Sequence, residues 1–127
     1  MGTLPPPTPT VHIVDDDAAI RDSLAFMLEV AGFAIRTYPS ATAFLGDRPA
    51  AAGDCVITDV RMPGLTGLEL MAVLRARGAA PPVIVMTGHG DRHLADQALR
   101  GGAADYLEKP FDESALLHAV EAVLAHA

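Results

Sequence analysis

Aspartates and a single lysine are the side chains in this sequence with the clearest capacity for chemistry. Asp15, Asp16 and Asp17 are consecutive, Asp59 ends a second apolar run, and Lys109 is the only lysine and directly precedes a proline. The other eight basic residues are all arginine. Two carboxylates about 4 Å apart repel each other by ~1 kcal/mol in water and by ~4 kcal/mol at an effective dielectric constant of about 20. If these aspartates meet in the fold, their pocket requires protons or a cation.

The alternation of apolar and polar residues predicts the elements that must position these groups. Short, mostly apolar runs predict strands at 11–15, 33–37, 55–58, 83–86 and 105–107. Longer segments with one apolar face predict helices at 18–31, 40–46, 67–77 and 92–100, and a last helix capped by Asp112 or Ser114. The mixed run 33–37 suits an edge strand, and the first, third and fourth runs suit central strands. Five βα units predict an α/β fold with a parallel sheet and helices on both faces.

Polar residues follow four of the five predicted strands. In open parallel sheets, ligands bind beyond the carboxyl ends of the strands, where the strand order reverses. Thr87 and Lys109 would lie at this edge together with the aspartates. If the strand order is 2-1-3-4-5, Asp15, Asp16 and Asp59 share one pocket. Two or three carboxylates with open positions suit Mg²⁺, and the ammonium of Lys109, a compact charge on a long stem, can reach one oxygen between crowded walls.

Each of these features also has a purely structural explanation. Asp15–Asp17 could cap a helix, and Asp59 could be an ordinary exit from a strand into a turn. The segment 87–90 could be a loop without a function, and Lys109 could be a solvated surface side chain. All four explanations would have to hold at once, at the ends of four strands, and this coincidence favours a common site.

Length, composition and charge restrict the function classes. The 127 residues, half of them hydrophobic, suit one domain with one core. A net charge of −7 argues against direct binding of nucleic acid by this domain. No apolar run approaches the ~18–20 residues of a membrane span. Residues 1–10 contain four prolines and are expected to form a flexible lead-in. Cys55 is the only cysteine, so no intrachain disulfide is expected. A cytoplasmic protein fits these features.

Four motifs resemble those of a known family. They are VDDD at 14–17, ITDVRMPGLTG at 57–67, VMTGHG at 85–90 and YLEKPF at 106–111. Through these motifs the chain resembles the receiver domain of two-component response regulators, over 11–124, and the FixJ-type regulators in particular. The resemblance implies a flavodoxin-like (βα)5 fold with strand order 2-1-3-4-5, formed by residues 11–127.

The resemblance also implies a metal and a phosphoacceptor. Asp59 would receive a phosphoryl group from a histidine kinase and become an aspartyl phosphate. Asp16, Asp59 and the backbone carbonyl of Arg61 would bind Mg²⁺, with Asp15 helping directly or through water. Mn²⁺ could substitute for Mg²⁺. The protein would be a signalling switch, with no enzymatic activity beyond its own phosphorylation and dephosphorylation.

A second group of residues would sense the phosphoryl group. By resemblance, Thr87 and Lys109 would hydrogen-bond its oxygens, Tyr106 would be the switch aromatic, and the Lys109-Pro110 peptide bond would be cis. His89, two residues after Thr87, could overlook the pocket, whereas the other histidines show no metal-ligand spacing. The face formed by 92–100 and 103–107 would pair two copies weakly after phosphorylation. The implied output is transcription, although FixJ-type proteins usually continue into a helix-turn-helix domain and this chain stops after its fifth predicted helix.

Three other functions fit the residues less well. A phosphatase of the haloacid-dehalogenase type needs a second acid two residues after its nucleophile, where this chain has Arg61. A flavin-binding module is disfavoured because the acidic pocket would repel a flavin phosphate and the chain has no tryptophan and two tyrosines. A receiver-like domain without phosphorylation is disfavoured because the acidic set is complete.

Overall fold

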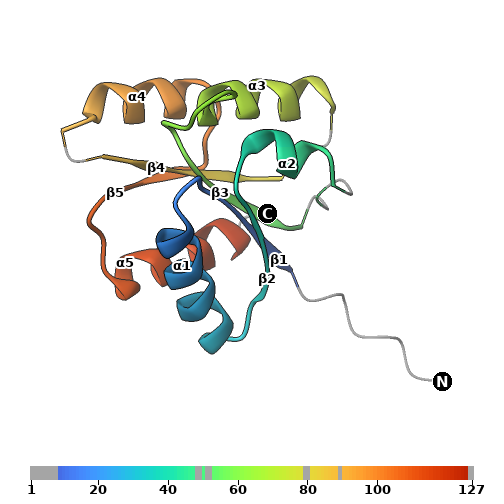
Figure 1. The fold of residues 1–127 in the computed structure, drawn as a ribbon. Helices are drawn as coiled ribbons and strands as arrows, with labels where there is room; N and C mark the ends of the chain where they lie inside the picture. The colour runs from blue at the N-terminus through green and yellow to red at the C-terminus, as the bar shows by residue number, and fades with distance from the viewer. Residues whose placement is uncertain (1–8, 48–49, 51–52, 79–80, 89, 126–127) are drawn as a thin grey trace.

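Five strands alternate with five helices in the computed structural model, which describes residues 9–47, 50, 53–78, 81–88 and 90–125 (Figure 1). The elements are β1 (Thr10–Val14), α1 (Ala18–Val30), β2 (Ala34–Tyr38), α2 (Ala41–Leu45), β3 (Cys55–Asp59), α3 (Gly67–Ala76), β4 (Val83–Thr87), α4 (Arg92–Arg100), β5 (Asp105–Glu108) and α5 (Glu113–Ala125). The predictions for residues 1–8, His89 and His126 lie outside the described residues.

All five strands are parallel, and their order is β2-β1-β3-β4-β5, as predicted. The register pairs Val14 with Thr58, and Asp59 with Met86, so the ends of β1, β3 and β4 are adjacent. The predicted strand boundaries differ from the observed ones by one residue at several ends. In particular, β1 ends at Val14, which leaves Asp15 just beyond the strand, whereas β3 continues through Asp59.

The sheet separates two layers of helices. In Figure 1, α1 and α5 lie on one face, and α2, α3 and α4 lie on the other. Each face has its own apolar core, because side chains alternate between the two faces along each strand. The first core includes Leu24, Leu28, Leu116 and Val120, and the second includes Leu70 and other large side chains from α2 and α3. Helices on both faces bury the central strands β1, β3 and β4, as their apolar sequences predicted.

Side-chain caps define the start of four helices. Asp17 accepts a hydrogen bond from the Ala19 amide at α1, so one of the three consecutive aspartates is indeed a capping residue. Ser40 caps α2 and Asp112 caps α5 in the same way, the latter at 2.8 Å from the Ala115 nitrogen. Thr66 begins α3 with a reciprocal capping box. Helix α4 is different, because Asp91 stands at its N-cap position and makes no side-chain cap hydrogen bond.

Two side chains that the sequence left without a function are structural. His12 is buried on β1, and its Nε2 lies 2.9 Å from Oδ2 of Asp54. Cys55 is fully buried on β3, and burial raises the pKa of its thiol to about 12. No helix in the described part of the chain has the length and apolar character to cross a membrane.

Candidate functional site

Three carboxylates meet at the carboxyl edge of the sheet. Asp15 and Asp16 directly follow β1, and Asp59 is the last residue of the neighbouring strand β3. One oxygen from each lies within 4.8 Å of the others. Asp15 is fully buried, Asp59 is partly buried and Asp16 is exposed. The pocket predicted from the strand order therefore forms, with one side open to solvent.

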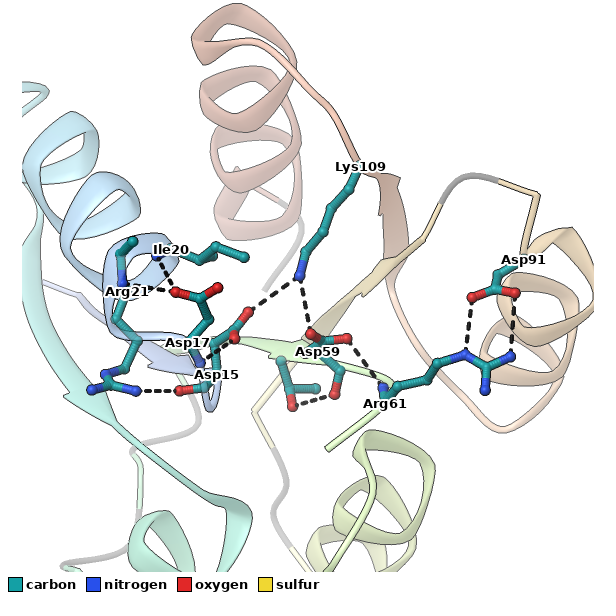
Figure 2. Close-up of polar contacts among 10 residues, drawn as sticks. Asp15, Asp17, Ile20, Arg21, Asp59, Arg61, Asp91 and Lys109 are labelled. Atoms are coloured by element: carbon teal, nitrogen blue, oxygen red, sulfur yellow. Dashed lines mark hydrogen bonds and ion pairs between the residues drawn. The ribbon is translucent and has the colours of Figure 1, made fainter. Parts of the chain in front are cut away.

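Lys109 enters this pocket from β5 and points between two of the carboxylates (Figure 2). Its Nζ lies 3.0 Å from Oδ2 of Asp59 and 3.4 Å from Oδ2 of Asp15. The backbone fixes the base of the side chain, because the Lys109 amide donates to the carbonyl of Thr87 at 2.7 Å. The Lys109-Pro110 peptide bond is cis, as the resemblance implied. Lys109 is thus part of the site and not a free surface lysine.

Burial and the charges of neighbouring groups together determine the pKa values of Asp15 and Lys109. Burial raises the pKa of Asp15, and the nearby charge of Asp59 adds to this effect. The Asp17 amide, which donates to Oδ1 of Asp15 at 2.9 Å, and the ammonium of Lys109 oppose it. For Lys109, burial alone would lower the pKa, but the hydrogen bond and charge of Asp59, followed by those of Asp15, outweigh burial and raise it. The lysine therefore stays protonated and partly neutralises the cluster.

The remaining charge of the cluster suits a divalent cation. Counted at their formal charges, the three carboxylates and the ammonium of Lys109 give the cluster a net charge of minus two. The donor atoms are all oxygens, and Asp16 keeps the site open to water and to a further ligand. Oxygen ligands with open positions are what Mg²⁺ requires when it also binds a phosphate group. The residues present therefore fit this ion.

The backbone around Asp59 is held closely by α3. The Gly67 amide donates to the carbonyl of Val60 at 3.0 Å. A Cβ atom at Gly67 would approach the carbonyl oxygen of Asp59 more closely than real Cβ atoms do. The absence of a side chain at the first residue of α3 therefore allows the helix to support the end of β3. This close approach explains why a glycine is required there.

Arg61 makes two contacts that join Asp59 to the start of α4. Its amide donates to Oδ1 of Asp59 at 3.1 Å. Its guanidinium binds both carboxylate oxygens of Asp91, with Nε to Oδ2 at 3.0 Å and Nη2 to Oδ1 at 3.3 Å (Figure 2). This hydrogen-bonded pair raises the pKa of Arg61 and lowers that of Asp91. The resemblance assigned a role only to the carbonyl of Arg61, so the side-chain pair was missed.

Thr87 and Tyr106 lie on the strands next to the carboxylates. Thr87 is the last residue of β4 and is buried. Tyr106 lies on β5, paired in register with Val85, two residues before Thr87. Its side chain is partly buried against the same core as Leu94 of α4. Thr87 is therefore at the edge of the pocket, whereas Tyr106 packs against the core that α4 also covers.

Comparisons with known proteins agree with this geometry. The family model of the response regulator receiver domain matches residues 11–121. The chain is 56% identical over 114 residues to the transcriptional regulatory protein FixJ of Azorhizobium caulinodans, covering 90% of this chain and 54% of the relative. It is 46% identical over 120 residues to the C4-dicarboxylate transport transcriptional regulatory protein DctR of Rhodobacter capsulatus, covering 92% of this chain and 61% of that relative. The chain thus spans a little over half the length of these curated relatives.

Solved structures show the same likeness. The crystal structure of FixJ-N superposes with a TM-score of 0.88 at 44% identity, covering 94% of this chain and 95% of that one. Full-length FixJ from B. japonicum gives a TM-score of 0.83 at 43% identity, covering 93% of this chain and 58% of that one. The flavodoxin-like fold and the predicted strand order are therefore confirmed. Together with the family model, these matches establish that the chain belongs to the receiver domain family of two-component response regulators and is of the FixJ type.

Proposed function

We propose that this receiver domain accepts a phosphoryl group on Asp59 from the phosphohistidine of a histidine kinase. The observation that carries the proposal is the position of the Lys109 ammonium, 3.0 Å from Asp59 and 3.4 Å from Asp15, with Asp16 beside them. A cation held against two carboxylates, next to an open position, is what an incoming phosphoryl group requires.

Asp15, Asp16, Asp59 and the carbonyl of Arg61 would hold Mg²⁺, or Mn²⁺ in its place. When bound, the ion supplies positive charge that offsets the charge on the phosphoryl oxygens. Asp15 is the most enclosed ligand, and its hydrogen bond from the Asp17 amide fixes the orientation of its carboxylate. Asp16 is exposed and completes the set from the solvent side.

The transfer itself depends on positioning. A carboxylate oxygen of Asp59 forms a bond to phosphorus as the bond from phosphorus to the histidine nitrogen of the donor breaks. The Lys109 ammonium then donates to a phosphoryl oxygen while Asp15 keeps it at the pocket. The hydroxyl of Thr87, at the end of β4, donates to a second oxygen. Loss of the phosphoryl group to water regenerates Asp59, so the domain acts on itself and on no separate substrate.

The output would pass through the face formed by α4 and β5. Thr87 and Tyr106 would change position together, because Tyr106 packs against the same core as Leu94 of α4. Arg92, Arg100 and Asp96 are exposed there, and Leu99 is 41% exposed, so the apolar area is small. We expect a weak homodimer that strengthens on phosphorylation, with opposite charges facing each other across a two-fold axis. Transcriptional control is proposed from the names of the relatives, and a location in the cytoplasm would follow from that role.

Phosphorylation by a small donor tests the proposal directly. The protein is incubated with Mg²⁺ and acetyl phosphate, and intact mass is measured for wild type, Asp59→Asn and the control Asp22→Asn. We expect wild type and the control, which changes an exposed aspartate on α1, to gain one phosphoryl group and Asp59→Asn to gain none. A gain in Asp59→Asn, or no gain in wild type, would contradict the assignment. Hydrolysis of added phosphomonoesters would instead indicate a phosphatase.

A further inference from the structure

Asp91 can bind Arg61 or cap α4, and in this structure it binds Arg61 and also accepts a backbone hydrogen bond from Gly88. It occupies the N-cap position of α4, where an aspartate ordinarily accepts hydrogen bonds from the first turn. Both of its carboxylate oxygens instead accept from the guanidinium of Arg61, at 3.0 and 3.3 Å. Its backbone, at φ −90° and ψ 38°, also differs from the extended conformation of the caps Asp17, Ser40 and Thr66. Binding to Arg61 therefore competes with capping of α4.

Both ends of this contact are connected to the phosphorylation site. The amide of Arg61 donates to Oδ1 of Asp59 at 3.1 Å. The amide of Asp91 donates at 3.1 Å to the carbonyl of Gly88, the residue directly after Thr87. The Arg61–Asp91 ion pair thus links Asp59 to the residue after Thr87.

The attachment of α4 to the sheet allows its N-terminus to move. The fully enclosed side chains of α4 are two alanines, Ala95 and Ala98. Small side chains bury little apolar area, so packing resists a displacement of this helix only weakly. In the Arg61–Asp91 pair the arginine is exposed and the aspartate is partly exposed, and ion pairs near the surface contribute little stability. Both attachments can therefore be exchanged for others.

We propose that Asp91 is a two-position switch that binds Arg61 at rest and caps α4 when Asp59 is phosphorylated. A phosphoryl dianion on Asp59 competes with the single carboxylate of Asp91 for the guanidinium of Arg61. The released carboxylate then accepts a hydrogen bond from the amide of His93, in the first turn of α4, and changes the position of that turn. The competition between the two partners of Asp91 is a property of the resting protein. Its control by phosphorylation rests on the function proposed above.

The resting competition is tested without any ligand. Amide signals of ¹⁵N-labelled protein are compared for wild type, Arg61→Gln, and the double variant Arg61→Gln with Asp91→Ala. In Arg61→Gln we expect the His93 amide to move downfield because Asp91 caps the helix, and in the double variant we expect this shift to disappear. Arg36→Gln is the matched control, because it removes an exposed ion pair of 3.1 Å with Asp47, away from α4. An unchanged His93 amide in Arg61→Gln overturns the competition.

The link to phosphorylation is tested with beryllofluoride, which mimics the phosphoryl group, at saturating Mg²⁺. In wild type we expect the Arg61 side-chain Nε–H signal and the His93 amide to shift together as beryllofluoride binds. Asp91→Asn loses the ion pair but retains a capping side chain. We therefore expect its midpoint, the beryllofluoride concentration at half-saturation, to fall about threefold below that of wild type. Asp91→Ala loses both partners, and its midpoint should exceed that of Asp91→Asn.

Two results would overturn the link, and they differ from a failure of the proposed function. If beryllofluoride binds and both signals stay in place, the switch is wrong while phosphorylation at Asp59 stands. Equal midpoints for Asp91→Asn and Asp91→Ala would show that capping by residue 91 has no part in the active state. If wild type binds no beryllofluoride, the proposed function fails. The competition between Arg61 and the first turn of α4 for Asp91 is then still decided by the ligand-free comparison of the His93 amide in wild type and Arg61→Gln.

Discussion

Helices α3 and α4 lie side by side on one face of the sheet, yet they are attached to it in different ways (Figure 1). α3 begins with a capping box, in which Thr66 and Glu69 exchange hydrogen bonds of 2.9 and 3.2 Å. It buries Leu70, Met71 and Leu74. α4 buries only alanines, and polar contacts with two arginines hold its ends, Arg61 at Asp91 and Arg75 at the Gly101 carbonyl.

The difference separates a rigid support from an adjustable element. Large buried side chains cannot be withdrawn without leaving a cavity. Exposed polar contacts can be exchanged at little cost in free energy. α3 also touches the backbone of Asp59 through Gly67, so the proposed phosphoacceptor rests on the helix that is held by burial. α4 can then respond to the state of Asp59 without disturbing its support.

The largest expected effect on stability comes from truncating the side chains with which α3 and α4 pack against the sheet. Leu70→Ala empties a fully buried position of α3 and should lower the free energy of unfolding by about 2–5 kcal/mol. Leu94→Ala, at a partly buried position of α4, should lower it by about 1 kcal/mol. Urea denaturation followed by circular dichroism measures both. Equal losses would mean that burial holds both helices equally.

A smaller effect is expected where α3 supports Asp59. Gly67→Ala places a methyl group against the Asp59 carbonyl and should lower the free energy of unfolding by about 1–3 kcal/mol. It should also slow phosphorylation by acetyl phosphate, because the end of β3 must shift. Gly53→Ala is the control, since a Cβ there meets no atom within 4 Å. If Gly67→Ala kept the stability and the phosphorylation rate of wild type, the hypothesis that α3 supports Asp59 would be wrong.

Metal binding should stabilise the ends of β1 and β3 more than it stabilises α4. At a Mg²⁺ concentration about ten times the Kd, binding should raise the free energy of unfolding by about 1.4 kcal/mol. Amide exchange should slow at the ends of β1 and β3, where the carboxylates lie, and less in α4. In Asp16→Asn, one of three like charges is lost, so the metal-free variant should melt above the metal-free wild type but gain less from Mg²⁺. An equal gain in both proteins would exclude Asp16 as a ligand.

The smallest effect concerns the helix caps. Thr66→Ala removes the cap of α3 and should cost about 1 kcal/mol of stability. Asp91→Ala removes a side chain that caps nothing in the resting protein, so no measurable change in Tm is expected. Differential scanning calorimetry of both variants makes the comparison. A loss at Asp91 as large as that at Thr66 would show that α4 is already capped at rest.

The sequence pattern predicted the five parallel strands, the resemblance supplied their order, and together they predicted the carboxylate pocket. Apolar runs ending in Asp15 and Asp59 predict the ends of two strands, the order implied by the resemblance makes these strands neighbours, and the backbone then places both side chains at one edge whatever their rotamers. The Arg61–Asp91 contact could not be predicted in this way. The two residues are 30 positions apart, and their contact depends on the conformation of a long, exposed arginine side chain. An aspartate directly before a helix is ordinarily interpreted as its cap. Only the structure shows that the Asp91 carboxylate binds the guanidinium of Arg61 and not the amides of the first turn of α4.

The scarcity of lysine gives the molecule a built-in labelling site. Apart from an α-amino group at the N-terminus, Lys109 is the only aliphatic amine that an acylating reagent can modify. Its contacts with Asp59 and Asp15 keep it protonated and therefore a poor nucleophile. Any change in the occupancy of the pocket alters those contacts, and the rate of acylation with it. The extent of labelling at one lysine, measured by mass, would therefore report on the state of the pocket in the unmodified protein, without a mutation or an attached probe.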